Sequence, residues 1–250
     1  MIEIRKVSHA YGATQALAGV TIDVPAGSVV GLVGPNGAGK TTLIRAIATL
    51  LRQDRGVVRV AGYDTVGEAR KARASLGYLP ERASPYSDLL AWEHLDLFAR
   101  IAGHHGPERG RRIDAALEAA GLSARRSTPC GQLSKGLRQG LALQACLLHD
   151  PRALVLDEPT DGLDPNQKHE IRGLTLELAK EKAVLLSTHI LEEVGAVCSR
   201  AVIINRGRVV FDGTAHELEE RAPKGVPAPL DVVFREITTS DVAELSGSQR

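Results

Sequence analysis

Short, uniformly apolar segments alternate with segments of helical periodicity along much of the chain. The apolar segments are bounded by Gly, Asp, Ser or Asn, which is typical of strands buried on both faces of a parallel sheet. They are Val29–Val33, Leu154–Leu156, Val184–Leu186 and Val202–Ile204. Between them, Thr41–Leu51 and Pro165–Lys180 have apolar residues at helical spacing, and Asp164 is a suitable N-cap for the second. We therefore expect an α/β fold built on a mostly parallel sheet.

Two regions depart from this alternation. The opening residues up to Gly27 and the segment Val57–Val60 alternate apolar and polar positions, which predicts a small antiparallel sheet beside the parallel one. From about Ser84 to His149 the sequence is helical in pattern, and one of its helices, Ile113–Ala120, should end at Gly121. We expect these residues, about 84–149, to form a helical subdomain inserted between strands of the main sheet.

The C-terminal part differs from the rest in composition. A Pro-rich stretch, Ala222–Pro229, is expected to end the compact domain, which would then cover residues 1–221 and leave 222–250 as a linker and tail. Leu230–Ile237 has an amphipathic pattern, so it either covers an edge of the domain, aids dimerisation or is a partly ordered tail. The last dozen residues are expected to be disordered.

Composition and charge exclude several classes of protein. The chain has 31 Lys and Arg against 30 Asp and Glu, so its net charge gives no argument for binding nucleic acid or an anionic membrane. The N-terminus lacks the features of a signal peptide, and no apolar stretch approaches the roughly 18 to 20 residues needed to cross a bilayer. Cys130, Cys146 and Cys198 are too irregularly spaced for a disulfide framework or a zinc site. We expect a cytosolic chain with reduced, buried thiols.

The most informative motif lies between the first apolar strand and the helix that follows it. Its sequence fits the pattern G-x-x-x-x-G-K-[ST] of a phosphate-binding loop. Glycines let backbone N–H groups turn toward phosphate oxygens, and the helix N-terminus adds the positive end of its dipole. The loop consists of Gly34, Pro35, Asn36, Gly37, Ala38, Gly39, Lys40 and Thr41.

Three side chains of this motif are assigned separate roles. Lys40 should neutralise the β and γ phosphates, Thr41 should bind Mg²⁺ through its hydroxyl, and Thr42 can hydrogen-bond a phosphate oxygen. The structural alternative is a glycine-rich turn beside a solvated lysine. The strand before the motif and the helix after it favour the phosphate-binding loop.

Two adjacent acids follow a second apolar strand. Asp157 and Glu158 come at its carboxyl end, the edge at which parallel α/β folds bind ligands. Because adjacent strand residues point opposite ways, one acid can face Mg²⁺ and the other can hold and deprotonate an attacking water. We assign Asp157 to the metal and Glu158 to the base. Adjacent surface acids are common after strands, so this assignment depends on the presence of Lys40.

The segment between the loop and the acids resembles a known motif. Residues 133–137 read Leu-Ser-Lys-Gly-Leu, which is similar to the signature motif of ABC ATPases, and the resemblance extends from about residue 1 to 218. It implies a P-loop NTPase core of the RecA-like type, in which Ser134 and Gly136 contact the γ-phosphate of ATP bound to the opposite subunit. A hydroxyl and amides at a helix N-terminus suit a phosphate. A simple helix N-cap at Ser134 is the alternative.

Other positions match the family pattern one by one. Tyr11, within Ala-Tyr-Gly, resembles the aromatic residue that stacks on adenine, and base stacking is favourable because every base has a π-face. His189, within Ser-Thr-His, resembles the switch histidine that senses the γ-phosphate. Gly162–Asp164 resembles the loop that joins the two ATP sites of a dimer. An isolated Tyr or His is more often structural, but the order and spacing here favour function.

The sequence also departs from the family pattern. Glu81 stands where the family usually has Gln, and its carboxylate is able to bind Mg²⁺ or water while adding negative charge to the site. Lys135, Leu137 and Gly140 are further differences in and after the signature motif. We still expect ATP hydrolysis, because both phosphate-contacting signature residues are present.

The resemblance implies an ATP-binding and ATP-hydrolysing subunit of a bacterial ABC transporter, most similar to export-type members associated with gliding motility, multidrug or copper transport. Two copies, or this chain and another ABC ATPase, would close around two MgATP and drive a separate permease. The permease would dock a cytoplasmic helix on Ala83–Asp88 and the helices up to Gly103, which would place the chain in the cytoplasm at the inner face of the cell membrane.

Two other hypotheses belong to different classes. One is a soluble ABC ATPase that acts on ribosomes, DNA or iron–sulfur assembly, and the other is a binding module that keeps the site without turnover. Translation-type members usually carry two ATPase domains, and DNA-repair members insert long coiled coils, neither of which is visible in this sequence. We therefore expect no direct nucleic-acid partner.

Overall fold

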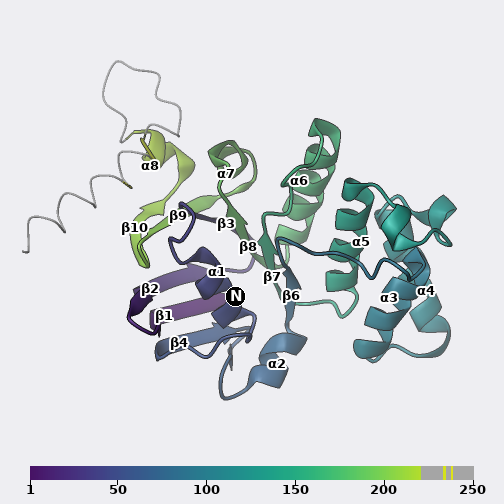
Figure 1. Cartoon of the computed structure of the whole chain (residues 1–250), viewed down its shortest axis with the longest axis horizontal. Coiled ribbons are helices and arrows are strands. Elements are labelled where there is room, and N and C mark those ends of the chain that lie inside the picture. Colours follow the sequence, from purple (N-terminus) through teal and green to yellow (C-terminus); the bar gives the residue numbers. More distant parts are fainter. Residues whose placement is uncertain (221–232, 235–237, 239–250) are drawn as a thin grey trace, which may run out of the picture.

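A six-stranded sheet forms the centre of the computed structural model, which describes residues 1–220, 233–234 and 238. The strand order is β10-β9-β3-β8-β7-β6 (Figure 1). Pairing is parallel from β6 to β9, and only β10 pairs antiparallel with β9. The strands are β3 (Ser28–Val33), β6 (Leu76–Leu79), β7 (Ala153–Asp157), β8 (Ala183–Thr188), β9 (Arg200–Asn205) and β10 (Arg208–Gly213). The predicted α/β fold with a mostly parallel sheet is confirmed.

The central strands are apolar throughout because both of their faces are covered. Every residue of β7 and β8 is buried. Val155 faces a cluster that includes α1 (Lys40–Ile47), whereas its neighbours Leu154 and Leu156 face the opposite cluster with α6 (Pro165–Ala179). Alternate residues of one strand thus supply two separate cores, which is why the sequence shows apolar runs instead of an alternating pattern.

A second, antiparallel sheet lies beside the first, as predicted. Its order is β2-β1-β4-β5. Ile2 and Ile4 of β1 are fully buried in the cluster that they share with α1. The strands are β1 (Ile2–Tyr11), β2 (Thr14–Val24), β4 (Arg55–Val60) and β5 (Tyr63–Asp64), followed by α2 (Ala69–Ala74).

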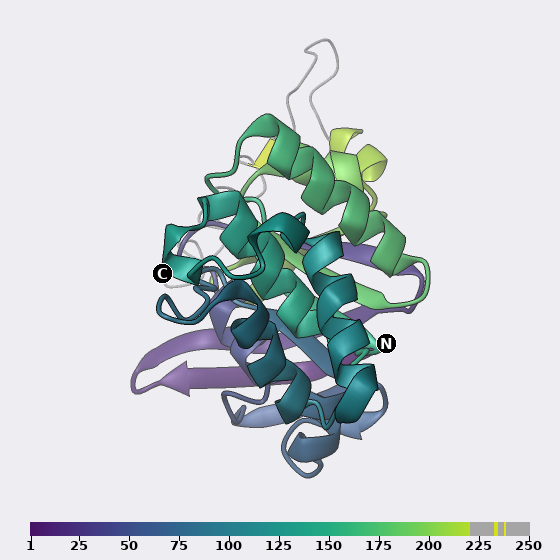
Figure 2. The same cartoon turned by 90° about the vertical axis from the view of Figure 1, so that its right-hand side faces the viewer.

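Three helices between β6 and β7 form a group at one end of the long axis of the molecule (Figures 1 and 2). They are α3 (Ala91–Ile101), α4 (Gly106–Ala119) and α5 (Lys135–Leu147). They share a hydrophobic cluster that includes Leu95, Leu117 and Leu141. The expected helix Ile113–Ala120 is the second half of α4, and Gly121, with φ +66°, follows its end. The structure therefore agrees with an inserted helical region.

The predicted start of one helix is confirmed, whereas the predicted end of another is wrong. In α6, Asp164 is the N-cap and its Oδ1 accepts hydrogen bonds from the amides of Asn166 and Gln167, both at 3.0 Å. The helix predicted at Thr41–Leu51 instead ends at Ile47. Thr49 adopts φ +61°, which turns the chain out of the helical path, so the apolar residues that follow it are not helical.

The cysteines are free, as expected. Cys130 is buried, and burial raises the pKa of the Cys146 and Cys198 thiols to about 12, so both stay protonated at neutral pH. Among the described residues, no helix is long and apolar enough to cross a membrane.

The C-terminal part of the described chain contains α7 (Leu191–Val197) and α8 (Ala215–Glu219). The Pro-rich stretch Ala222–Pro229 and the last dozen residues lie outside the described residues. Of the predicted amphipathic segment, only Val233 and Phe234 are described. Val233 is buried in a cluster with residues of β3, β9 and α7.

Candidate functional site

Glycine shapes the loop that connects β3 to α1. A Cβ atom on Gly34 would lie 2.3 Å from the carbonyl oxygen of Ile204, and one on Gly39 would lie 2.5 Å from that of Ala16. Gly39 also has φ +111°, a conformation that other residues avoid. These two positions let the loop pass close to neighbouring strands. No side chain caps the start of α1, so its first amide N–H groups are available to an anion.

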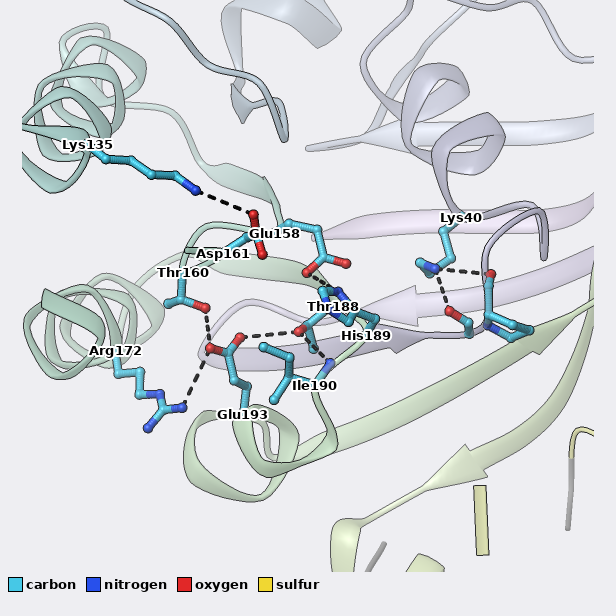
Figure 3. A network of polar contacts seen from close by, with 12 residues as sticks. Lys40, Lys135, Glu158, Thr160, Asp161, Arg172, Thr188, His189, Ile190 and Glu193 are labelled. Carbon is cyan, nitrogen blue, oxygen red and sulfur yellow. Dashed lines mark hydrogen bonds and ion pairs between the residues drawn. The ribbon is translucent and has the colours of Figure 1, made fainter. Parts of the chain in front are cut away.

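Lys40, the first residue of α1, is buried beside this loop. Its Nζ donates hydrogen bonds to the carbonyl oxygens of Gly34, at 2.5 Å, and Pro35, at 3.3 Å (Figure 3). Burial lowers the pKa of Lys40, whereas the charge of Glu158 is the main influence in the other direction. Of the two threonines that follow, Thr41 is exposed and Thr42 is buried. The ammonium is therefore held at the loop that the sequence assigned to phosphates.

The two acids after β7 occupy different surroundings. Asp157 is the buried last residue of the strand, and burial raises the pKa of its carboxyl. Glu158 has φ +49°, in the left-handed region, which costs about 1 to 3 kcal/mol for a residue other than glycine. The sequence predicted that strand alternation would point the two acids in opposite directions. This explanation is wrong, because β7 ends at Asp157 and Glu158 lies beyond it in a left-handed turn.

Glu158 is paired with His189. The Nδ1 atom of His189 lies 2.9 Å from Oε2 of Glu158 (Figure 3). The two residues meet because β7 and β8 are parallel, with Asp157 opposite Ser187, and both lie one residue beyond the end of their strand. Burial raises the pKa of Glu158, and the hydrogen bond with His189 opposes this shift. A raised pKa makes the carboxylate a stronger base at neutral pH.

These residues border one cavity of about 350 Å³. Its lining combines three phosphate-loop residues with Glu81, Glu158 and the histidine, but not Lys40 or Asp157. It consists of Gly34, Pro35, Asn36, Glu81, Glu158, Asp161, His189 and Phe234. The cavity is thus the point at which the predicted loop, base, switch histidine and Glu81 come together. Such a polar hollow beside a lysine and uncapped helix amides fits the phosphate chain of a nucleotide.

Two of the lining residues were not singled out from the sequence. Asp161 lies three residues after Glu158, so its proximity to the acids was the available signal. Phe234 belongs to the predicted amphipathic segment near the C-terminus, and no pattern in the sequence relates it to the loop at residues 34–36. Its position is a long-range contact that only the tertiary structure reveals.

Other predicted site residues do not line this cavity. Tyr11 is exposed at the end of β1 and packs edge-on against His9, with ring centroids 4.7 Å apart. Ser134 is the N-cap of α5, and its hydroxyl accepts a hydrogen bond from the amide of Leu137 at 3.3 Å. The N-cap interpretation is therefore correct for this chain by itself. It leaves the γ-phosphate role of Ser134 and Gly136 as a prediction.

The signature segment is nevertheless linked to the loop after Glu158. Nζ of Lys135 lies 3.5 Å from Oδ2 of Asp161, and both side chains are exposed (Figure 3). Among the residues that the structure describes, no group of three His, Cys, Asp or Glu side chains converges on a metal position. The Mg²⁺ ligands predicted from the sequence, Thr41, Glu81 and Asp157, therefore stay a prediction.

The chain is similar to a known family and to several known proteins. A family model described as ABC transporter matches residues 17–161. The Nod factor export ATP-binding protein I of Sinorhizobium fredii is 37% identical over 218 residues, which are 87% of this chain and 64% of that protein. The Daunorubicin resistance ATP-binding protein DrrA3 of Streptomyces coeruleorubidus is 42% identical over 229 residues, 90% of this chain and 71% of that protein. The chain thus spans less than two thirds of the first of these relatives.

Solved structures give the same result. The structure of an ATP binding subunit of an ABC transporter superposes with a TM-score of 0.85 at 34% identity and covers 95% of this chain and 99% of that one. A dimeric ATP-binding cassette in a post-hydrolysis state, bound to ADP and Pi, superposes with a TM-score of 0.77 at 25% identity, over 86% and 98% of the two chains. The fold and the order of the motifs are those of ATP-binding cassettes.

Gly39→Ala should raise the Kd for ATP by at least about tenfold, because the added Cβ would collide with a neighbouring backbone and displace the loop. Fluorescence titration with an ATP analogue measures the affinity. Gly103→Ala is the matched control, since Gly103 also has a positive φ, +85°, but has no atom within 4 Å of the added Cβ. Equal affinities for the two variants would contradict the assignment of the loop.

As the pH falls, ATP turnover should be lost when Glu158 is protonated, because protonation removes the base. Burial raises the pKa of Glu158, so this loss should occur at a higher pH than it would for a glutamate with an ordinary pKa. In His189→Ala the acid limb should move to still higher pH, since the hydrogen bond that lowers the pKa of Glu158 is lost. Phosphate release measured as a function of pH tests this, with His216→Ala in α8 as the control. An unchanged acid limb in His189→Ala would refute the pairing.

Proposed function

The chain belongs to the ABC transporter ATP-binding family, and we propose that it is the ATP-hydrolysing subunit of a bacterial export-type ABC transporter. The observation that carries this proposal is the single cavity at which the phosphate loop meets the Glu158–His189 pair. The printed names of two relatives, for Nod factor export and daunorubicin resistance, support the export class. We place the nucleotide-binding domain at residues 1–221, with the helical subdomain at about 84–149 and a linker and tail at 222–250.

The residues present fit MgATP. The glycines and uncapped amides of the loop form a cradle for the phosphates, and Lys40 supplies a buried positive charge. Thr41 and Asp157, with Glu81 from the neighbouring strand end, would hold Mg²⁺, which neutralises phosphate charge when bound. Glu158 takes a proton from the attacking water, and His189 keeps the carboxylate oriented through its hydrogen bond.

The complete site requires a second ATPase subunit. Ser134 is exposed and neither signature residue lines the cavity of its own chain, which supports a phosphate contact made across an interface. A two-fold pair supplies that contact twice, because each subunit then faces the other with the same surface. The dimeric cassette among the similar structures supports a homodimer or a pair with another ABC ATPase.

A second cavity supports docking of a permease. It measures about 380 Å³, and Arg82, Ala83 and Pro85 line it together with Phe98 of α3. Residues of β6, Pro80 and residues of α5 complete the lining. The cavity overlaps the groove expected at residues 83–103 and extends beyond it to β6 and α5. A largely apolar hollow of this kind accepts an amphipathic helix. Glu81 borders the first cavity and Arg82 the second, so adjacent residues join the nucleotide site to the docking site. Docking there would place the chain at the cytoplasmic face of the membrane.

Glu158→Gln should lower ATP hydrolysis at least about hundredfold and trap a dimer in MgATP, because the amide cannot accept the proton while the nucleotide contacts remain. Light scattering after size-exclusion chromatography measures the mass with and without MgATP. Glu181→Gln, at an exposed position away from the cavity, is the control. A Glu158→Gln protein that stays monomeric and hydrolyses ATP at the normal rate would refute the proposal.

Co-expression with its permease should carry the chain into the membrane fraction, and Ala83→Glu should release it while ATP binding persists, because a charge in the apolar groove opposes docking. Val66→Glu, at an exposed apolar position outside the groove, is the matched control and should stay with the membrane. Sedimentation followed by immunoblotting measures the distribution. A chain that sediments with ribosomes or DNA, and not with membranes, would contradict the transport role.

A further inference from the structure

A buried acid next to the proposed site has no role in the mechanism given above. Glu193 lies on α7 and is only 1% exposed. Burial of a carboxylate is unfavourable unless hydrogen bonds and an opposite charge replace the lost water. The partners that satisfy Glu193 therefore indicate what this side chain holds together.

Three different elements supply those partners (Figure 3). The hydroxyl of Thr160, in the loop after β7, donates to Oε1. The hydroxyl of Thr188, the last residue of β8, donates to Oε2 at 3.2 Å. Nη2 of Arg172, on α6, lies 3.6 Å from Oε1. Both carboxylate oxygens are used, and the two threonine protons are both directed at them.

Each threonine fixes a segment that carries a proposed catalytic group. The Thr188 hydroxyl also accepts a hydrogen bond from the amide of Ile190 at 3.0 Å, so the backbone is tied on both sides of His189. On the other loop, the amide of Asp161, next to Thr160, donates to the carbonyl of Glu158 at 3.2 Å. Glu193 therefore lies at the junction of the segments that bring Glu158 and His189 within 2.9 Å of each other.

We propose that Glu193 is a positioning residue for ATP hydrolysis, which holds the loop after β7 and the turn at His189 in register through Thr160 and Thr188. This inference rests on the proposed function. None of the hydrogen-bond partners of Glu193 belongs to the phosphate loop, so loss of this link should affect the chemical step and leave ATP binding nearly unchanged. A buried network in which both carboxylate oxygens of Glu193 accept hydrogen bonds restricts the motion of the segments it joins, which preserves the geometry that catalysis needs.

The network also reaches toward the proposed subunit interface. Asp161, directly after Thr160, pairs with Lys135 beside the signature serine. The loop between Glu158 and Asp161 is thus held by Glu193 on its buried side and by Lys135 on its exposed side. In a closed dimer, a change at the signature segment would act on this loop, and Glu193 would pass the change on to the turn that carries His189.

Thr160→Val tests the inference with little change of shape, because valine replaces the hydroxyl with a methyl group. We expect kcat to fall at least about tenfold while KM for ATP changes by less than about twofold, since geometry and not binding is affected. Thr160→Ser, which keeps the hydroxyl, should retain turnover. Thr175→Val is the matched control: Thr175 is 1% exposed, Thr160 is 2% exposed, and the Thr175 hydroxyl bonds only within α6.

Glu193→Gln provides the second variant. The amide keeps the shape of the side chain but replaces an acceptor oxygen with a donor, which opposes either a threonine proton or Arg172. The same fall in kcat with an unchanged Kd for a fluorescent ATP analogue is expected. Thermal unfolding of all four variants shows whether each is folded at the assay temperature.

The outcomes separate this inference from the proposed function. Turnover of Thr160→Val and Glu193→Gln at the wild-type rate would overturn the positioning role and leave the ATPase assignment intact. An equal loss in Thr175→Val, or a weakened ATP affinity that accounts for the whole loss, would also overturn it. Absence of ATP turnover by the wild-type chain with its permease would overturn the proposed function and, with it, this inference.

Discussion

The parallel pairing of β3, β8 and β7 is the constraint on which the site depends. Its register places Val33 opposite Thr188 and Asp157 opposite Ser187, so the three strands end at one edge of the sheet. The next residue on each chain segment is Gly34, His189 or Glu158. Backbone hydrogen bonds thus bring together a phosphate loop, a histidine and an acid that are far apart in the sequence, and the side chains require only short turns to meet.

Burial at this edge of the sheet disfavours the charged forms of the site residues, and their mutual attraction opposes that effect. Removal from water raises the pKa of Asp157 and Glu158 and lowers that of Lys40, so each charge would be unfavourable by itself. Lys40 and the two acids oppose one another's shifts, and His189 adds a hydrogen bond to Glu158. The balance keeps an acid near the loop with a raised pKa, which is what a general base needs.

The sequence predicted the features that depend on local pattern. Apolar runs identified the central strands, and the glycine pattern identified the loop, because both are imposed over a few neighbouring residues. It did not predict the left-handed turn at Glu158 or the end of α1 at Ile47, ahead of the left-handed Thr49, since neither left-handed residue is a glycine. The position of Phe234 and the burial of Glu193 next to the exposed Glu192 depend on tertiary contacts, and the sequence pattern does not distinguish these adjacent acids.

The signature segment lies apart from the cavity, so under the proposed function a second subunit would supply its phosphate contact. Ser134 satisfies its own helix as an N-cap, so α5 is stable without a phosphate and its N-terminus stays exposed. The site of one chain therefore holds the proposed base and the lysine, and the proposed signature contact would come from the other chain. Asp161 pairs with Lys135, and Thr160 bonds to Glu193. The same short loop therefore contacts both the signature segment and the network behind the Glu158–His189 pair. Closure of a pair would then complete the phosphate contacts and act on the base through one connected segment, which makes hydrolysis conditional on assembly.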